Sequence, residues 1–205
     1  IAIGVNALKS QSGNAHCNTA IGYNAMIYSD SGGCNTAVGA LALETNASSD
    51  TCNTAVGVRA LCSNQGNNNV AVGALALDKN AAADNNTAVG TLASACNTTG
   101  SSNVSVGSSA LKTATTSSNS TAIGFEALLN NNGSNNTAVG RDSLKNNTSG
   151  TQNTALGKCG LCANTTGTEN TAVGLQAMHF GTTGSFNTAL GAYSLGASDV
   201  NTGDS

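Results

Sequence analysis

The sequence predicts an all-β fold: a parallel β-solenoid with one turn of about 17 residues per repeat and about twelve turns. Three observations indicate this fold. A glycine recurs at a nearly constant interval, a short apolar and polar motif precedes each of these glycines, and the side chains of an ordinary globular core are scarce. Aromatic residues are only 3% of the 205 residues, and Trp and Pro are absent.

The period is set by twelve glycines, called here the anchor glycines. The eleven intervals from Gly4 to Gly191 average about 17 residues, and none departs from this mean by more than a single residue. A fixed period of this length is typical of solenoid proteins. The anchor glycines are Gly4, Gly22, Gly39, Gly57, Gly73, Gly90, Gly107, Gly124, Gly140, Gly157, Gly174 and Gly191.

A short strand is expected immediately before each anchor glycine. The repeated motif is Asn-Thr-Ala-Val-Gly-x-x-Ala-Leu, which is clearest at Asn35–Gly39 followed by Ala42 and Leu43. Thr and Val are two residues apart and share one face of an extended strand, while Asn, Ala and Gly share the other. The Ala-Leu pair after the glycine suits a second short strand or a turn. We expect each turn to bury the Val, the Leu and some Ala.

The remainder of each period is polar and predicts a corner of the coil. Asn164-Thr165-Thr166-Gly167 is an example, and another glycine recurs seven residues before most anchor glycines. Gly and Asn tolerate left-handed backbone angles, which corners require. Helical repeats are the rival interpretation, but Gly, Asn and Thr recur throughout and are poor helix formers. Turns stacked ~4.8 Å apart would give a rod ~50 Å long.

One motif asparagine per turn predicts a ladder of stacked asparagines. Its members are Asn18, Asn35, Asn53, Asn69, Asn86, Asn103, Asn136, Asn153, Asn170 and Asn187. The small side chains of the Ala-Gly face allow backbones to approach closely. We therefore expect a homotrimer with this face near the threefold axis, and the alternative is that Ala and Gly fill a thin single-chain coil.

Seven cysteines do not indicate one chemistry. Cys17, Cys34 and Cys52 each precede a motif asparagine and would stack on consecutive turns. Cα atoms ~4.8 Å apart are within disulfide range, so a disulfide between turns, an interchain disulfide and a column of unbonded thiols all remain open. Cys159 and Cys162 form a lone C-x-x-C, and zinc sites need four ligands, so we expect no metal site.

Composition excludes several classes of function. Seven basic and ten acidic residues are scattered, with a net charge of −3 and no basic patch, so we expect no nucleic-acid partner. No apolar run approaches the ~20 residues that span a bilayer, so we expect no membrane insertion. His16 and His179 are more than nine turns apart, and no cluster of nucleophile, base and acid is visible. We expect no enzymatic activity, no catalytic residue and no cofactor.

The repeated motif also resembles those of known families. Asn-Thr-Ala-Val-Gly-x-x-Ala-Leu with its Asn-Thr-Thr-Gly spacers resembles the repeat arrays of phage and viral tail-fibre proteins, and of bacterial proteins that share their endosialidase-type chaperone. It is also similar to the head repeats of trimeric autotransporter adhesins, which form trimeric left-handed parallel β-rolls. The resemblance extends from Ile1 to about Leu195. It implies a left-handed coil, a homotrimeric fibre and a shaft or head at a host surface.

The first functional hypothesis follows from this resemblance. Residues 1–205 form a single repetitive segment, expected to be an interior piece of a longer chain, because Ile1 lies within a motif. We expect an extracellular fibre segment, on a virion tail fibre or a cell surface, that presents or contributes to attachment through a host-surface glycan or protein receptor. Two alternatives are a self-assembling extracellular filament that grows end to end, and an ice-binding solenoid that uses the column of motif threonines.

Overall fold

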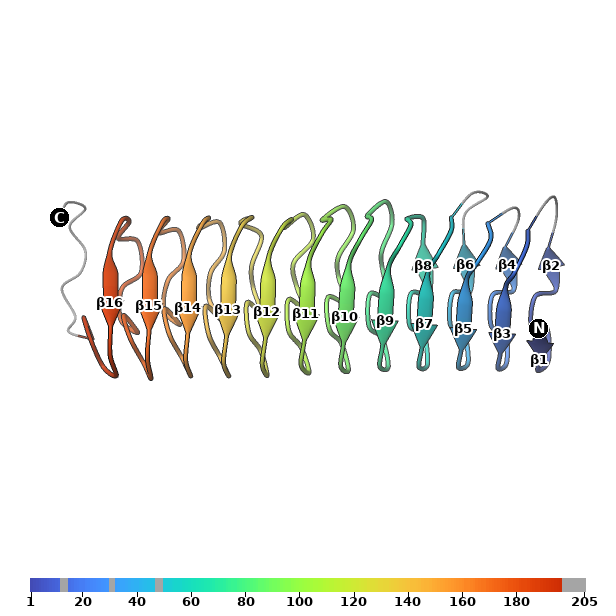
Figure 1. Cartoon of the computed structure of the whole chain (residues 1–205), viewed down its shortest axis with the longest axis horizontal. Helices are drawn as coiled ribbons and strands as arrows, with labels where there is room; N and C mark the ends of the chain where they lie inside the picture. The colour runs from blue at the N-terminus through green and yellow to red at the C-terminus, as the bar shows by residue number, and fades with distance from the viewer. Residues whose placement is uncertain (12–14, 30–31, 47–49, 197–205) are drawn as a thin grey trace.

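The computed structural model describes residues 1–11, 15–29, 32–46 and 50–196. Within these residues the chain has no helix and forms short strands in two parallel sheets (Figure 1). The larger sheet contains, in spatial order, β1 (Ala2–Ile3), β3 (Thr19–Ile21), β5 (Thr36–Val38), β7 (Thr54–Val56), β9 (Val70–Val72), β10 (Thr87–Val89), β11 (Val104–Val106), β12 (Thr121–Ile123), β13 (Thr137–Val139), β14 (Thr154–Leu156), β15 (Thr171–Val173) and β16 (Thr188–Leu190).

A second, four-stranded sheet belongs to the N-terminal turns alone. Its strands are β2 (Ser10–Gln11), β4 (Tyr28–Ser29), β6 (Thr45–Asn46) and β8 (Ser63–Asn64), paired in that order. From the fifth turn onward the equivalent segment is a turn. The twelve-stranded sheet is therefore the one element that continues along the whole rod.

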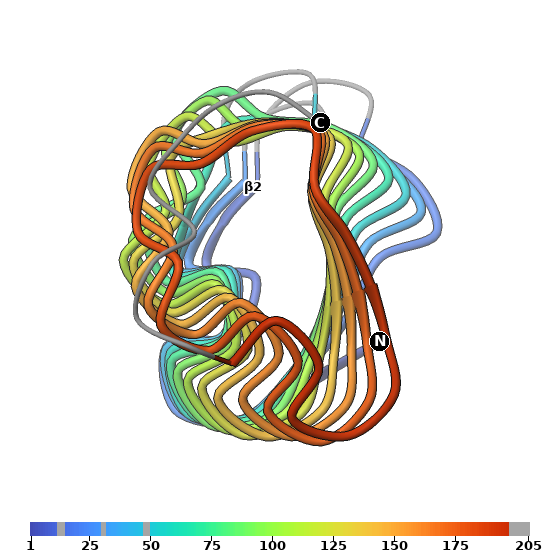
Figure 2. The same ribbon diagram turned by 90° about the vertical axis from the view of Figure 1, so that its left-hand side faces the viewer.

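The register of the large sheet confirms the predicted β-solenoid. Each strand pairs in parallel with the equivalent strand of the next turn, so that Thr137 lies beside Thr154 and Ala138 beside Ala155. Viewed along its axis, the chain winds around one common interior (Figure 2). In the same view successive turns are rotated relative to one another, so the rod has a gradual twist about its long axis.

The interior contains the motif alanines and the turn leucines. Ala138 and Ala155 on the strands and Leu144 and Leu161 in the turns are at most 2% exposed. Val139 and its equivalents point outward, so the expectation that this residue is buried was wrong. A coil with so few residues in each turn has a narrow interior, and alanine from the strand opposite leucine from the turn already fills it.

The small face of the strand therefore lies inside one chain rather than between three. The expectation that the Ala-Gly face lies near a threefold axis is corrected by the complete burial of the motif alanines within a single coil. The alternative, a thin single-chain coil filled by Ala, is the one found. This removes the packing argument for a homotrimer, which stays a prediction.

The segment after each anchor glycine is a turn and not a second strand in most of the rod. In one such turn the anchor Gly157 has φ +133°, and Cys159 and Leu161 have φ +57° and +49°. The left-handed φ of Leu161 turns its side chain inward. The backbone N–H of Leu161 donates to the carbonyl of Ala177 in the next turn, at 3.0 Å. Anchor glycines are also required by space, because a Cβ built on Gly140 would lie 2.5 Å from the carbonyl oxygen of Gly157.

The glycine at the polar corner has a different role from the predicted one. Gly100 and Gly133 lie at a corner, as expected, but their φ angles are outside the left-handed region. A Cβ at Gly100 would overlap the backbone carbonyl of Ser117 in the next turn. At Gly100 and Gly133 the backbone of the next turn therefore leaves no room for a side chain, whereas Ala83 and Ser117 occupy the equivalent position of other turns.

Candidate functional site

The motif asparagines form a continuous internal ladder over most of the rod. The Asn153 Nδ2 donates to the carbonyl of Gly167 at 2.8 Å, and its Oδ1 accepts the backbone N–H of Asn170, the equivalent residue of the next turn, at 3.0 Å. The same pattern begins at Asn18 and Asn35. Each amide therefore joins one turn to the next and satisfies a corner carbonyl that is buried from water.

One turn departs from this ladder. Ser120 replaces the asparagine, and its backbone N–H still donates to Asn103 Oδ1 at 3.0 Å. Its hydroxyl accepts the backbone N–H of Asn136 at 3.3 Å. Serine thus preserves the chain of acceptors, but it lacks the amide donor that would reach the corner carbonyl.

A second buried ladder was missed from the sequence. The first asparagine of the Asn-Thr-Thr-Gly spacer points inward, and Asn164 Nδ2 donates to Asn147 Oδ1 at 2.7 Å and to the carbonyl of Gly167 at 3.1 Å. Its members are Asn64, Asn80, Asn97, Asn131, Asn147 and Asn164. The signal was the recurrence of an asparagine seven residues after the anchor glycine in all but one of the periods from Gly57 to Gly157. At Ala114 the ladder is interrupted, and the Ser117 hydroxyl accepts from Asn131 Nδ2 at 2.8 Å instead.

The outer face of the twelve-stranded sheet is an uncharged surface that follows the whole rod. We call it the Thr–Val face. Its first column contains Thr19, Thr36, Thr54, Val70, Thr87, Val104, Thr121, Thr137, Thr154, Thr171 and Thr188. Its second column contains Ile3, Ile21, Val38, Val56, Val72, Val89, Val106, Ile123, Val139, Leu156, Val173 and Leu190. Parallel pairing places each member directly beside its equivalent in the next turn.

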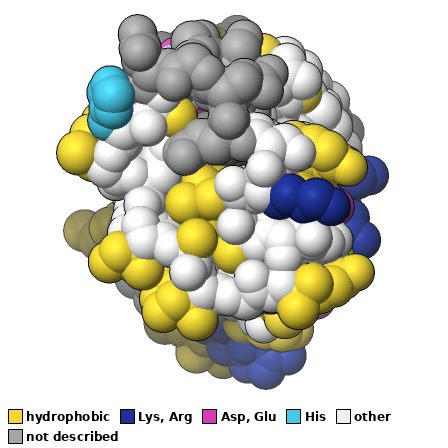
Figure 3. Space-filling view, turned by 90° about the vertical axis from the view of Figure 1, so that its right-hand side faces the viewer, with side chains coloured by type: hydrophobic (Ala, Val, Ile, Leu, Met, Phe, Trp, Pro, Cys, Tyr) yellow, Lys and Arg dark blue, Asp and Glu magenta, His cyan; other side chains and the backbone are white. Residues whose placement is uncertain are grey.

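The Thr–Val face remains partly open to solvent. Val89, Leu156 and Ile123 are 36–40% exposed, although each lies between two neighbouring strands. No Lys, Arg, Asp or Glu occupies any position of its two columns. In the view onto the N-terminal end, the Lys and Arg side chains gather at the right and the bottom of the molecule rather than around its whole circumference (Figure 3). The face is therefore a long apolar strip with a line of hydroxyl groups.

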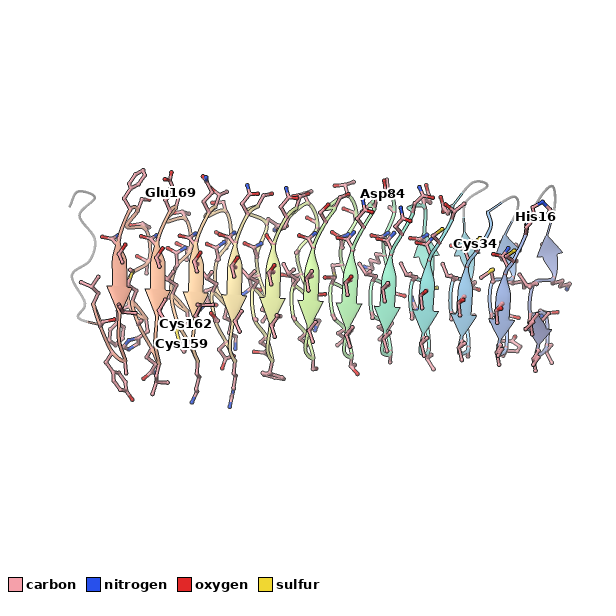
Figure 4. The ribbon with its side chains drawn as sticks, in the orientation of Figure 1. His16, Cys34, Asp84, Cys159, Cys162 and Glu169 are labelled. Atoms are coloured by element: carbon pink, nitrogen blue, oxygen red, sulfur yellow. A yellow bond between two sulfur atoms is a disulfide. The ribbon has the colours of Figure 1, made fainter. Side chains whose placement is uncertain are left out.

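Three cysteines form an exposed column near the N-terminal end of the rod. Cys17, Cys34 and Cys52 are free thiols, with φ angles of 58°, 60° and 60° (Figure 4 labels Cys34). The N–H of Cys34 donates to the carbonyl of His16 at 2.8 Å, and that of Cys52 to Gly33 at 3.1 Å. Partial desolvation, followed by repulsion from and hydrogen bonding to the two flanking thiols, raises the pKa of Cys34. Within the chain the three thiols are unbonded, so the disulfide between turns is absent, and the interchain disulfide stays an open interpretation.

The C-x-x-C pair forms a disulfide. Cys159 and Cys162 are bonded across one turn, with Cα atoms 4.9 Å apart (Figure 4). The sequence interpretation considered zinc for this pair and did not predict the disulfide. The turn after an anchor glycine places residues three apart at the two ends of a tight bend, and that separation is within disulfide range.

Ionisable side chains outside the Thr–Val face form small local clusters. Arg59 makes an ion pair with Asp78 at 3.1 Å, and Cys62 donates to Glu44 at 3.3 Å. Burial, followed by the hydrogen bond to the Glu44 carboxylate, raises the pKa of Cys62 to about 11. Since neighbouring carboxylates disfavour the thiolate, this cysteine stays protonated and unreactive at neutral pH.

A second cluster lies in the turns after two neighbouring anchor glycines. Lys145 contacts Glu126 at 2.5 Å and Asp142 at 3.3 Å, and the hydrogen bond to Glu126 raises the pKa of Lys145. The Arg141 guanidinium lies 5.7 Å from the centre of the Phe125 ring. These side chains are partly exposed, and they connect turns at the outer edge of the rod.

Other sites of chemistry are absent from the described part of the chain. His179 contacts the carbonyl of Gln176 and the ring of Phe180, far along the rod from His16. Within residues 1–11, 15–29, 32–46 and 50–196 there is no group of three or more His, Cys, Asp or Glu that could hold one metal ion, and no pocket. In the same ranges no helix is long and apolar enough to cross a membrane.

The geometry thus offers three features with functional potential: two internal amide ladders, an uncharged face along the rod, and a column of exposed thiols. Comparison with known proteins gives no further identification, because neither a family model, nor a curated protein, nor a solved structure matches the chain.

Proposed function

We propose that the chain is a structural segment, shaft or head, of an extracellular fibre on a virion or a cell surface, where it presents or contributes to attachment to a host-surface glycan or protein. The observation that carries this proposal is the Thr–Val face, an uncharged strip that extends along all twelve strands of the large sheet. Its length is ~50 Å at ~4.8 Å per strand. Isolated soluble chains rarely expose an apolar strip of this extent unless it binds something.

A second copy of the same chain is the partner that fits this face. Two uncharged faces do not repel each other, and parallel columns at the strand spacing of the solenoid interdigitate with columns at the same spacing. The twist seen in Figure 2 is matched by another rod with the same twist. The proposed fibre is therefore a homotrimer or other small bundle of rods that pack through the Thr–Val face and wind about a common axis.

The test measures assembly and its dependence on this face. Native mass spectrometry and analytical ultracentrifugation of the chain should find an elongated oligomer, expected to be a trimer, that resists dodecyl sulfate. Val89→Lys places a charge in the second column and should release monomers. Thr166→Lys, at an exposed corner away from the face, is the matched control and should assemble normally. A wild-type chain that stays monomeric would remove the proposal.

Ice binding is the second candidate, favoured by one observation. Nine threonines lie in register in the first column of the Thr–Val face, which gives a regular array of hydroxyl and methyl groups. Two features oppose it: Val70 and Val104 interrupt the threonine column, and the rod twists whereas an ice plane is flat. Thermal hysteresis of the purified chain, absent in Thr137→Lys, would favour ice binding over the fibre.

A filament that grows end to end is the remaining alternative. Negative-stain microscopy separates it from a bundle of rods, because a filament extends far beyond the length of one chain. A lateral bundle keeps the length of a single rod and becomes wider.

A further inference from the structure

The thiols of Cys17, Cys34 and Cys52 stand apart from the other cysteines of the chain. Cys62 is buried against a carboxylate, Cys159 and Cys162 are bonded to each other, and Cys96 has no cysteine in the equivalent position of the next turn. The three column thiols are exposed, unbonded and on consecutive turns. At the same position of the next turn lies Asn68, so the column contains three thiols.

The backbone holds these three side chains in the same orientation. Their φ angles of 58°, 60° and 60° are nearly identical, and the hydrogen bonds from Cys34 and Cys52 to the preceding turn fix the distance between turns. Cys34 is the middle residue of the three, with Cys17 on the turn before it and Cys52 on the turn after it. The backbone therefore places the three Cα–Cβ bonds one above another on consecutive turns, with Cys34 in the middle.

The spacing of this column suits an ion held between two sulfur atoms. Turns ~4.8 Å apart place an ion midway between neighbouring sulfurs at ~2.4 Å from each. Metal–thiolate bonds have this length, ~2.3 Å for zinc. Because no three ligands of the described residues surround one point, the geometry excludes a tetrahedral cage and favours ions that accept two thiolates in a line. Soft monovalent ions such as Cu(I) and Ag(I) prefer thiolate ligands and accept this coordination.

We propose that Cys17, Cys34 and Cys52 form a binding site for soft, monovalent thiophilic metal ions, in which each ion bridges two thiolates of consecutive turns and Cys34 is the shared ligand. Binding of one ion forms two metal–sulfur bonds and releases two protons to solvent from the two thiols, with no change in oxidation state. This site is independent of the fibre role, because the thiols lie outside the Thr–Val face.

The test titrates the full chain with Ag(I), which stays monovalent throughout, under argon and without added reductant, so that the Cys159–Cys162 disulfide is retained. Isothermal titration with a competing thiol ligand measures the affinity. Cys34→Ser leaves Cys17 and Cys52 two turns apart, ~10 Å, too far for one ion to bridge. We expect at least a tenfold loss of affinity in this variant.

Two further variants make the result specific. Cys17→Ser keeps the pair of Cys34 and Cys52 and should retain the affinity of the wild type. Cys96→Ser removes a single thiol elsewhere and should leave binding unchanged, while circular dichroism verifies that each variant is folded. Equal affinity in Cys34→Ser and the wild type would overturn the proposal, and so would a mass spectrum showing Cys34 in a disulfide before metal is added.

Discussion

Removing one amide from the internal ladder should weaken the rod by far more than removing an exposed one. Asn153 is completely buried, and its Oδ1 accepts the backbone N–H of Asn170 at 3.0 Å. In Asn153→Ala that N–H loses its acceptor inside the coil. An unsatisfied buried donor costs about 1–3 kcal/mol.

A second contribution comes from the donor side of the same amide. Asn153 Nδ2 donates to the carbonyl of Gly167 at 2.8 Å, but Asn164 Nδ2 also donates to this oxygen, at 3.1 Å. The carbonyl thus keeps one partner, and the loss here is that of one hydrogen bond, about 1 kcal/mol. Together the two contributions predict a destabilisation of about 2–4 kcal/mol for Asn153→Ala.

The assay is equilibrium urea denaturation followed by far-UV circular dichroism, with two variants for comparison. Asn153→Ser should be milder than Asn153→Ala, because the hydroxyl of Ser120 already accepts an N–H in this ladder. Asn146→Ala removes an exposed amide that donates to the Cys162 carbonyl at 2.8 Å, and it should cost about 1 kcal/mol or less because water can replace this bond. If Asn153→Ala and Asn146→Ala are equally mild, the ladder does not stabilise the solenoid and the reasoning is refuted.

Three further predictions concern glycine, left-handed angles and pH. Gly140→Ala should lower the free energy of unfolding by about 3 kcal/mol or more, because the new Cβ would lie 2.5 Å from the Gly157 carbonyl oxygen. Gly191→Ala has the same type of φ but no neighbouring atom within contact distance, so it should cost about 1–3 kcal/mol. Thermal unfolding of the two variants compares these costs. Glu169→Gly should stabilise the rod by about 0.5–1 kcal/mol, because Glu169 is an exposed non-glycine residue held at a strained φ of +57°. Urea titration measures this change, and an unchanged midpoint of urea unfolding would contradict the prediction. The pKa of Cys62 is raised to about 11 from 9.0, so the unfolded chain ionises first and stability is lost as pH rises from about 9 to about 11. Cys62→Ala should remove that loss, on the order of 1–2 kcal/mol after allowance for solvent screening, and an identical pH profile in both proteins would disprove it.

The period and the strand position were predictable because both follow from local spacing. Gly140 and Gly157 mark two turns whose strands end immediately before them, as the motif indicated. The ladder position was also visible, since a polar residue that recurs once per turn must face its own copies. These features depend on the sequence interval alone.

The direction of the strand faces could not be predicted in the same way. Alternation shows that Ala138 and Val139 face opposite sides, but it does not say which side is the interior. The volume of the coil interior determines which face is buried. A narrow interior has room only for alanine on the strand when Leu144 enters from the turn. That leucine reaches the interior through a φ of +50°, an angle that sequence patterns give no reason to expect for leucine.

The spacer asparagine shows the same limitation. Asn147 and Asn164 were assigned to a corner of the coil because Gly and Asn tolerate the left-handed angles of turns, and nothing in this assignment indicated burial. In the structure they are buried and hydrogen-bonded to each other at 2.7 Å. In a thin coil even the corner has an inner side, and a polar residue there is stable because the adjacent turn supplies its partner.

Since every hydrogen bond between turns is directed along the length of the rod, a load that pulls its two ends apart acts on these bonds one turn at a time. A turn of about 17 residues occupies ~4.8 Å when stacked and spans ~58 Å when drawn out. Each turn that opens therefore lengthens the chain by ~50 Å while the remaining turns stay closed. The turns are therefore expected to open under tension in steps of similar length, shortest for the turn closed by Cys159 and Cys162, and an opened turn finds its neighbour still in place as a template on which to close again.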